Sequence, residues 1–455
     1  MKTVDVGALL DEGRWTGYQK LLVFGTALTI ILDGVDNQLL PNTIPTLIKE
    51  WGLPRAAFIN ALASGPFGMM IGGLLGGVMG DRLGRRAALL ASVITFGLLT
   101  IAIAFVETPG TLLILRFLSG VGLGGAMPNA ATLASEYVPR RQRPSAVTFT
   151  IVCIPLGGFV AAELAARIIP SYGWQNLFII GGAIPLVLAA ILWFVLPESP
   201  RFMAQRKERW PELTRLLRRI GHNVPDDVTY VETATPGVPA KRASLGDLFA
   251  PSYLRDTGGL WGSFFFCLMV NYVAIQLVPA MLSGAGFDQP SASRGLTMVN
   301  IGGVVGAVMG ALIIQRLGSR VTMLGMSAIA VVCSLVMTQI PLNPTDTFNL
   351  MAMFLITGGL LNAVQTTMYA LAAHVYPTEI RSTGVGAAVA FGRVGNVLAV
   401  YVGNYALNLG GSPAYFTSWA ILMALVFLSL AIIQRHVART SSVGDGAAVA
   451  APASH

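Results

Sequence analysis

Apolar runs of about 20 residues, the length that a helix needs to cross a membrane, recur along almost the whole of this 455-residue chain. Only 11% of its residues are charged, whereas a soluble domain usually carries about 25%. The runs are long and continuous rather than short and alternating, which favours helices over a closed β-barrel. The sequence therefore predicts an all-α integral membrane protein.

Polar breaks divide these runs into twelve predicted spans, six on each side of a polar central segment. The spans are expected at residues 19–41, 56–80, 87–107, 111–138, 145–169, 174–196, 257–284, 291–314, 321–341, 347–375, 384–409 and 413–435. The predicted domains are a six-helix bundle over 1–196, a cytoplasmic central loop over 197–256, a second six-helix bundle over 257–436 and a disordered cytoplasmic tail over 437–455. Within the loop, apolar residues on one helical face of 210–220 predict an interfacial helix, followed by a flexible segment around 236–239.

Basic residues gather on one side of the predicted membrane topology. The net charge is +8, and most Lys and Arg residues fall in the termini, the central loop and alternate short loops. The positive-inside rule then places both termini and the central loop in the cytoplasm. This distribution explains the charge without a nucleic-acid partner. Acidic residues near the start exclude a cleavable signal, so the first span is expected to anchor the chain.

The two halves share sequence features at similar offsets. Residues 81–86 (DRLGRR) align with 315–320 (QRLGSR) at an offset of 234, which also places Gly68, Gly72 and Gly76 on Gly302, Gly306 and Gly310. A second stretch, at an offset of 238, places Pro139 on Pro377, Arg143 on Arg381 and Glu136 on His374. Such parallel halves are typical of alternating-access transporters with a site between the halves near the midplane.

Two aspartates in the first span are the leading candidates for proton coupling. Burying a charged side chain at the bilayer centre costs roughly 2.5–3.5 kcal/mol on the lenient scale, so it needs a reason. Asp33 and Asp36 are three residues apart and share a helix face, and Asn37, a candidate for binding the substrate, extends the polar patch. Two close carboxylates in a poorly hydrated site tend to keep a proton between them. The alternative is that one of them pairs with an arginine to hold the fold together.

Two arginines inside spans are candidates for binding an anion. Arg116 stands near the start of the fourth span and Arg393 inside the eleventh. A guanidinium stays charged and fits a carboxylate with two parallel hydrogen bonds, so both favour an anionic substrate. A structural ion pair is the alternative, and for Arg116 it is as well supported as binding.

Glu136 and His374 end the fourth and tenth spans at equivalent repeat positions. A histidine or a desolvated carboxyl can change its charge near neutral pH, so both are candidates for proton relay, with a structural role as the alternative. Glu163 in the fifth span has no assigned role. No metal cluster, phosphate-binding loop or nucleophile–base set is recognisable in the sequence. We therefore expect that the protein is not an enzyme and uses no cofactor.

The loop after the second span resembles a motif of the major facilitator superfamily. An acid and three arginines follow a glycine stripe there, and the residues concerned are Gly77, Asp81, Arg82, Gly84, Arg85 and Arg86. The resemblance implies the major facilitator fold, with twelve transmembrane helices in two pseudo-symmetric bundles. It also implies that Asp81 and Arg85 latch the cytoplasmic side in one conformation, which would make this set gating residues rather than substrate ligands.

Longer segments resemble one branch, the aromatic acid:proton symporters, which import benzoate-type and hydroxyphenyl carboxylates such as 4-hydroxybenzoate in bacteria. The segments are residues 33–36 (DGVD), 126–130 (AMPNA), 135–137 (SEY), 197–199 (PES), 376–379 (YPTE), 381–386 (RSTGVG) and 392–393 (GR). The resemblance implies proton coupling by Asp33 and Asp36, binding of the substrate carboxylate by Arg393 and Arg116, and a need for Glu136 and Arg381 in transport. We expect Arg381 to be a further gating residue. We also expect a carrier in the bacterial inner membrane that functions as a monomer.

Some positions depart from the branch's pattern. Val35 and Ala387 stand where aromatic residues are usual, and 396–400 (NVLAV) lacks a common Gly-Pro. The pocket could therefore suit a different or aliphatic acid. A sugar or polyol carrier, a drug exporter and a transporter-like sensor of aromatic acids are further alternatives.

Overall fold

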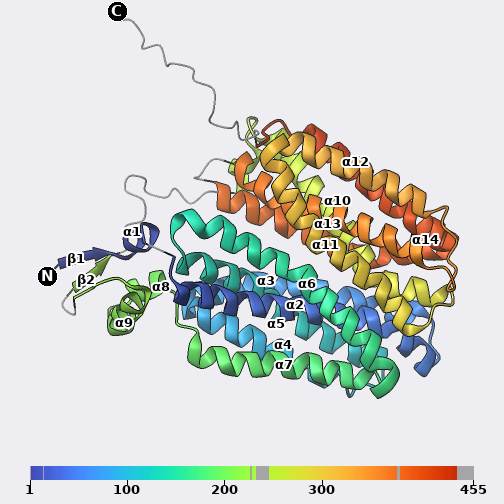
Figure 1. The fold of residues 1–455 in the computed structure, drawn as a ribbon, viewed down its shortest axis with the longest axis horizontal. Helices are drawn as coiled ribbons and strands as arrows, with labels where there is room; N and C mark the ends of the chain where they lie inside the picture. Colours follow the sequence, from blue (N-terminus) through green and yellow to red (C-terminus); the bar gives the residue numbers. More distant parts are fainter. Residues whose placement is uncertain (1, 14, 226–227, 232–244, 377–379, 438–455) are drawn as a thin grey trace, which may run out of the picture.

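The computed structural model describes residues 2–13, 15–225, 228–231, 245–376 and 380–437. Long helices lie side by side along the length of the molecule (Figure 1). In the described part, eleven helices are long and apolar enough to cross a membrane. Those of the first half are α2 (Gly17–Trp51), α3 (Ile59–Leu83), α4 (Arg85–Ile103), α5 (Pro109–Tyr137), α6 (Arg143–Tyr172) and α7 (Trp174–Val195). Those of the second half are α10 (Leu254–Gly284), α11 (Gln289–Leu317), α12 (Ser319–Met337), α13 (Phe348–Val375) and α14 (Arg381–Ile432).

The last of these helices supplies two crossings rather than one. α14 contains 52 residues, and at 1.5 Å per residue a straight helix of that length would span about 78 Å, more than twice the hydrocarbon core. Its backbone leaves the helical region at Gly410 and at Gly411, where φ is 62°, a value that glycine adopts without strain. The two arms of α14 therefore correspond to the predicted spans 384–409 and 413–435, and the all-helical membrane fold is confirmed.

The first span is longer than predicted. The sequence suggested an end at residue 41, where the first of two prolines stands, but α2 continues through Pro41 and Pro45 to Trp51. It ends where Gly52 adopts a φ of 64°. Proline is tolerated inside membrane helices because neighbouring helices and polar side chains compensate for the lost hydrogen bond.

Within each half, a glycine stripe lets two helices pack closely, and the helix pairs concerned are equivalent in the two halves. A Cβ atom on Gly72 of α3 would lie 2.0 Å from the backbone oxygen of Val121 on α5. At the equivalent positions of the second half, a Cβ atom on Gly306 of α11 would lie 1.9 Å from the backbone oxygen of Gly359 on α13. The same offsets of 234 and 238 relate both pairs, so the sequence repeat is also a repeat of helix packing.

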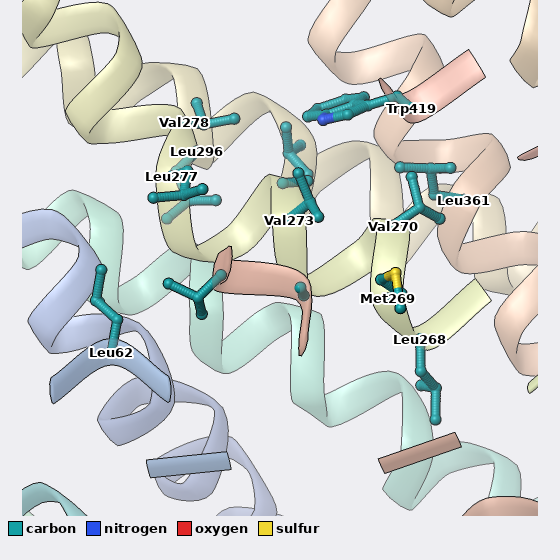
Figure 2. Close-up of a cluster of buried hydrophobic side chains, with 14 of the residues drawn as sticks. Leu62, Leu268, Met269, Val270, Val273, Leu277, Val278, Leu296, Leu361 and Trp419 are labelled. Carbon is teal, nitrogen blue, oxygen red and sulfur yellow. The ribbon is translucent and has the colours of Figure 1, made fainter. Parts of the chain in front are cut away.

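Apolar side chains fill the space between the helices of the second half. Figure 2 shows part of this core, in which Val270, Val273 and Leu277 of α10 lie near Leu296 of α11 and Trp419 of α14. All five side chains are buried. This packing holds α10 and α14 together, and both of these helices contribute to the site described below.

The N-terminus and the central segment form a small unit at one end of the bundle, which we call the terminal end; the other is the far end. Here β1 (Lys2–Asp5) pairs in parallel with β2 (Val228–Val231), a short strand pair outside the membrane helices that the sequence did not indicate. The unit also contains the helices α1 (Val6–Asp11), α8 (Pro200–Ala204) and α9 (Trp210–Ile220).

The helix predicted at residues 210–220 is α9. Its apolar residues Leu213, Leu217 and Ile220 are buried against Val6 and Leu10 of α1. The prediction that this face rests on a membrane surface was therefore wrong, because the N-terminal segment covers it. The segment around residues 236–239 and the tail from residue 438 onward lie outside the described residues.

Candidate functional site

A cavity of about 250 Å³ lies between the two halves. Eight helices line it, four from each half at equivalent places in the repeat: α2, α3, α5 and α6, and α10, α11, α13 and α14. Its polar side chains are Asp33, Asn37, Gln38, Asn271, Tyr272, Asn300, Asn362, Gln365, Thr366, Tyr369, Arg393 and Asn396. A site formed by both halves changes shape whenever the halves move relative to each other.

One acidic and one basic side chain line this cavity from opposite halves. Asp33 of α2 is 5% exposed, and Arg393 of α14 is half-buried. The Nη1 atom of Arg393 donates to the backbone oxygen of Met69 on α3 at 2.7 Å. Among the described residues, no carboxylate oxygen lies within 4 Å of Arg393. Arg393 therefore keeps donors available for an anion that enters the cavity.

Amides and phenols supply further polar groups. Asn37 donates from Nδ2 to the Tyr272 hydroxyl at 3.1 Å, and Gln38 and Asn300 exchange two hydrogen bonds of 3.0 and 2.8 Å across the halves. Asn396 is 8% exposed, and its Oδ1 atom accepts no hydrogen bond from any described residue. An unpaired buried acceptor is costly, so it favours a ligand that carries a donor.

The second aspartate of the first span lies in a different environment. The Oδ2 atom of Asp36 accepts from Arg116 Nη1 at 2.9 Å, and the Asp36 backbone oxygen accepts from Arg116 Nη2 at 3.1 Å. The Thr100 hydroxyl donates to the other carboxylate oxygen of Asp36. Asp36 and Arg116 are 1% and 4% exposed and do not line the cavity. The structure thus separates the two aspartates and places Arg116 against Asp36.

Three other titratable candidates also lie away from the cavity. Glu136 is half-buried at the end of α5, and His374 is exposed at the end of α13. Glu163 of α6 accepts a hydrogen bond from the Thr297 hydroxyl of α11 at 3.2 Å and pairs with Arg167 at 3.4 Å. The contact with Thr297 joins the two halves, a role that the sequence did not indicate.

The predicted gating loop forms a compact charged cluster at the terminal end. Asp81 and Arg85 form an ion pair. Gly84 has a φ of 107°, and a Cβ atom on it would lie 2.2 Å from Glu198 Oε2. Glu198 Oε1 accepts from the backbone N–H of Arg86 at 2.9 Å, at the start of α4. Glu198 is a site residue that sequence reasoning missed, although the segment 197–199 carries part of the family resemblance.

The remaining predicted gating residues also lie at the terminal end of their helices. Arg86 donates to the backbone oxygen of Trp193, and the Arg82 backbone oxygen accepts from Arg206 at 2.6 Å. A Cβ atom on Gly77 would meet no atom of the described residues within 4 Å beyond its own helix backbone. Arg381 donates from Nε to the backbone oxygen of Tyr376 at 3.3 Å, at the start of α14.

Hydrogen bonds between the halves gather towards the far end. Arg55, before α3, donates to Asn404 and Asn408 of α14 at 2.9 and 2.7 Å. Tyr401 donates to Asn60 at 3.0 Å, and Gln289 donates to the backbone oxygen of Asn42 at 2.6 Å. These contacts hold the two halves together on the far side of the cavity.

Several curated transporters are similar to this chain over most of its length. It is 32% identical to a gallate transporter of Pseudomonas putida over 415 residues, which are 91% of each chain. It is 31% identical to the 4-hydroxybenzoate transporter PcaK of Acinetobacter baylyi, with 97% of this chain and 96% of that protein covered. A benzoate transport protein of the same species is 29% identical, with 90% and 88% covered. The resemblance to aromatic acid carriers is confirmed.

Solved structures show the same fold. A bacterial homologue of the human lysosomal transporter Spinster, in an inward-facing and unoccupied conformation, has a TM-score of 0.67 at 16% identity and covers 92% of this chain and 98% of its own. A D-xylose-proton symporter has a TM-score of 0.66 at 18% identity, covering 93% and 99%. The sequence model of the Major Facilitator Superfamily matches residues 26–400. The chain therefore belongs to the Major Facilitator Superfamily and is a multi-pass membrane transporter rather than an enzyme.

Proposed function

We propose that this protein imports a small aromatic carboxylate together with a proton, by alternating access at the cavity between its halves. The observation that carries the proposal is that Asp33 and Arg393 line one cavity from opposite halves. The relatives that transport gallate, 4-hydroxybenzoate and benzoate support the substrate class.

Charge balance in the cavity explains why a proton would accompany the substrate. With Asp33 ionised, the lining carries one negative and one positive charge. A carboxylate bound to Arg393 adds a second negative charge to a poorly hydrated space, where an uncompensated charge is costly. Protonation of Asp33 removes that excess. The loaded site is then neutral, and the carrier can change conformation with substrate and proton bound together.

The rest of the lining suits an aromatic ring with polar substituents. Tyr272, Tyr369, Met69 and Met127 offer ring and thioether surfaces, which make favourable contacts with aromatic ligands. The cavity volume of about 250 Å³ lies below the usual range for drug-sized ligands, about 300–1,000 Å³. A single substituted ring therefore fits this site better than a large drug molecule.

The positive-inside rule supports a cytoplasmic terminal end in a bacterial inner membrane. In that orientation the hydrogen bonds at the far end would close the cavity to the outside. The Asp81–Arg85 pair and its neighbours lie at the cytoplasmic end, where they would stabilise one gating state. Since all eight lining helices come from one chain, a monomer suffices.

Asp36 and Arg116 receive a different role from the one that the sequence suggested. Their mutual ion pair satisfies both charges inside the first half. We therefore assign them to the stability of that half, and leave Asp33 and Arg393 as the coupling and binding groups. Glu136, His374 and Arg381 stay candidates for steps at the cytoplasmic end.

Uptake of radiolabelled 4-hydroxybenzoate into proteoliposomes tests this proposal. A gradient that is acid outside and negative inside should drive accumulation by the native protein. Asp33→Asn should abolish gradient-driven accumulation but retain exchange between labelled and unlabelled substrate, because it mimics the protonated carrier. Arg393→Ala should abolish both activities.

The exposed Arg294 of α11 provides a matched control. Arg294→Ala also removes an arginine side chain, but at the far end and outside the cavity, and it should leave uptake unchanged. Gradient-driven accumulation by Asp33→Asn would refute the coupling role. Transport of sugars or aliphatic acids, without any of benzoate, hydroxybenzoate or gallate, would refute the substrate class.

A further inference from the structure

A second cavity, of about 590 Å³, lies at the terminal end outside the transport site. It is formed by one face of α9, the last residues of α7 with the two residues that follow it, and the starts of α2 and α4. Its lining consists of Tyr18, Arg86, Phe194, Val195, Leu196, Pro197, Glu212, Arg215, Leu216, Arg218 and Arg219. Four arginines and one glutamate give it a positive charge.

Contacts to fixed partners hold three of the four arginines in place. Arg86 donates to the backbone oxygen of Trp193 and lies over the Trp193 ring at 5.5 Å. Arg218 donates to the Val224 backbone oxygen at 3.0 and 2.7 Å. Arg219 lies over the ring of Tyr18 at 5.8 Å. These contacts of Arg86 and Arg219 are to a backbone oxygen and to aromatic rings, which leave both guanidinium charges in place.

The acid in the cavity leaves this charge in excess. Glu212 pairs with Arg209 at 3.5 Å, and Arg209 does not line the cavity. Within the described residues, no carboxylate oxygen lies within 4 Å of Arg215 or Arg219. The cavity is therefore suited to an anion that accepts several charge-assisted hydrogen bonds, as a phosphate group does.

An apolar strip on α7 leads directly to this basic cavity. Val187, Ile191 and Phe194 are 61%, 53% and 87% exposed, and their spacing places them on one face of the helix. α7 is a membrane span on the outside of the bundle (Figure 1), so this face meets lipid chains. Phe194 belongs to both the strip and the cavity lining. A ligand that fits both has an anionic head and an apolar tail.

We propose that this cavity binds the head group of an anionic phospholipid from the leaflet at the terminal end, with an acyl chain along α7. A free phosphate would match the arginines but not the strip, and a zwitterionic lipid would bring an ammonium group into a cationic cavity. The bound lipid would connect α9 to the end of α7 and the start of α4. It would thereby stabilise the unit formed by the N-terminus and the central segment.

The test measures lipid binding by the full-length protein in detergent. Native mass spectrometry and thermal melting are followed while phosphatidylglycerol, phosphatidylethanolamine or inorganic phosphate is added. Phosphatidylglycerol should bind and raise the melting temperature, whereas the other two should not. Arg215→Gln with Arg219→Gln should weaken the binding of phosphatidylglycerol about 30-fold, as expected when two arginines near a membrane surface are lost.

Two further variants make the outcome specific. Arg140→Gln with Arg141→Gln removes two exposed arginines at the same end, outside the cavity, and should leave binding unchanged. Arg215→Glu alone serves if the first double variant does not fold. Equal binding by phosphatidylethanolamine or an equal effect of inorganic phosphate would overturn the proposal, as would unchanged affinity in the Arg215 and Arg219 variants.

Discussion

Replacing Asp36 by asparagine should destabilise the protein strongly, whereas the same change at Asp33 should not. Arg116 is only 4% exposed, and Asp36→Asn removes the counter-ion of its guanidinium. Breaking a buried ion pair by removing one partner costs about 3–5 kcal/mol. By contrast, no carboxylate–cation pair within 4 Å involves Asp33 among the described residues, so a neutral amide there breaks no direct ion pair.

A third variant separates the ion pair from other effects of the substitution. Asp36→Leu combined with Arg116→Met replaces both charges by apolar groups of similar size, which is often neutral or stabilising at buried pairs. The double variant should therefore recover most of the stability lost in Asp36→Asn, a coupling that two independent sites would not show.

The assay is thermal melting of purified protein in detergent, followed by tryptophan fluorescence, with proton-driven uptake measured on the same preparations. We expect Asp36→Asn to melt well below the native protein, and Asp33→Asn to melt near it while losing coupling. A loss below about 0.5 kcal/mol in Asp36→Asn, the range of an ordinary surface substitution, combined with loss of coupling, would show that Asp36 carries the proton. Our separation of the two aspartates would then be wrong.

Three other predictions follow from particular contacts. Gly72→Ala should lower the stability of the fold by about 1–3 kcal/mol, because its Cβ atom would lie 2.0 Å from the Val121 backbone oxygen. The control is Gly325→Ala, where the described residues leave open space, and equal melting temperatures of the two variants would refute the close-packing argument. Arg55→Ala removes the hydrogen bonds to Asn404 and Asn408 and should open the far end. Distance measurements between spin labels on the two halves at that end would detect the opening, and an unchanged distance distribution would contradict the prediction. Asp11→Asn should break the ion pairs with Arg143 and Arg201 at a cost of under about 1 kcal/mol, since these groups are partly exposed, and should speed amide exchange in residues 2–13; unchanged exchange would show that strand pairing alone holds the segment.

The fold could be predicted because the membrane imposes it through simple rules. Long apolar runs must form helices, and their number and order follow from the polar breaks between them. Details that depend on tertiary contacts could not be predicted. The continuation of α2 beyond Pro41 needs neighbouring helices to compensate for the lost hydrogen bond. The pairing of β1 with β2 joins two four-residue strands between which all six membrane helices of the first half lie in the sequence.

The candidate site was only partly predictable, and helix geometry explains why. At about 100° per residue, Asn37 lies about 40° from Asp33 around α2, Gly34 about 100° and Gln38 about 140°, all in one rotational direction. These residues line the cavity. Asp36 lies about 60° from Asp33 in the opposite direction, which turns it away from the cavity and towards Arg116. A spacing of three placed both aspartates on a common face but could not show where the cavity begins.

The sequence repeat accounts for the shape of the site but not for its charges. The offset of 234 pairs Asn37 with Asn271, and both line the cavity. The same offset pairs Asp33 with Cys267, and the offset of 238 pairs Arg393 with Pro155. Each half thus contributes one charged group to the cavity, at a position where the other half has none.

This asymmetry has a mechanistic consequence. In the proposed alternating-access mechanism the halves rock about the cavity, and the distance between the carboxyl of Asp33 and the guanidinium of Arg393 would then change because the two groups belong to different halves. Their attraction changes with that distance, and so does the tendency of Asp33 to bind a proton. An ion pair within one half, such as Asp36 with Arg116, would keep its geometry throughout the cycle. The position of the two charges across the moving boundary is therefore what would couple proton release to the change in access.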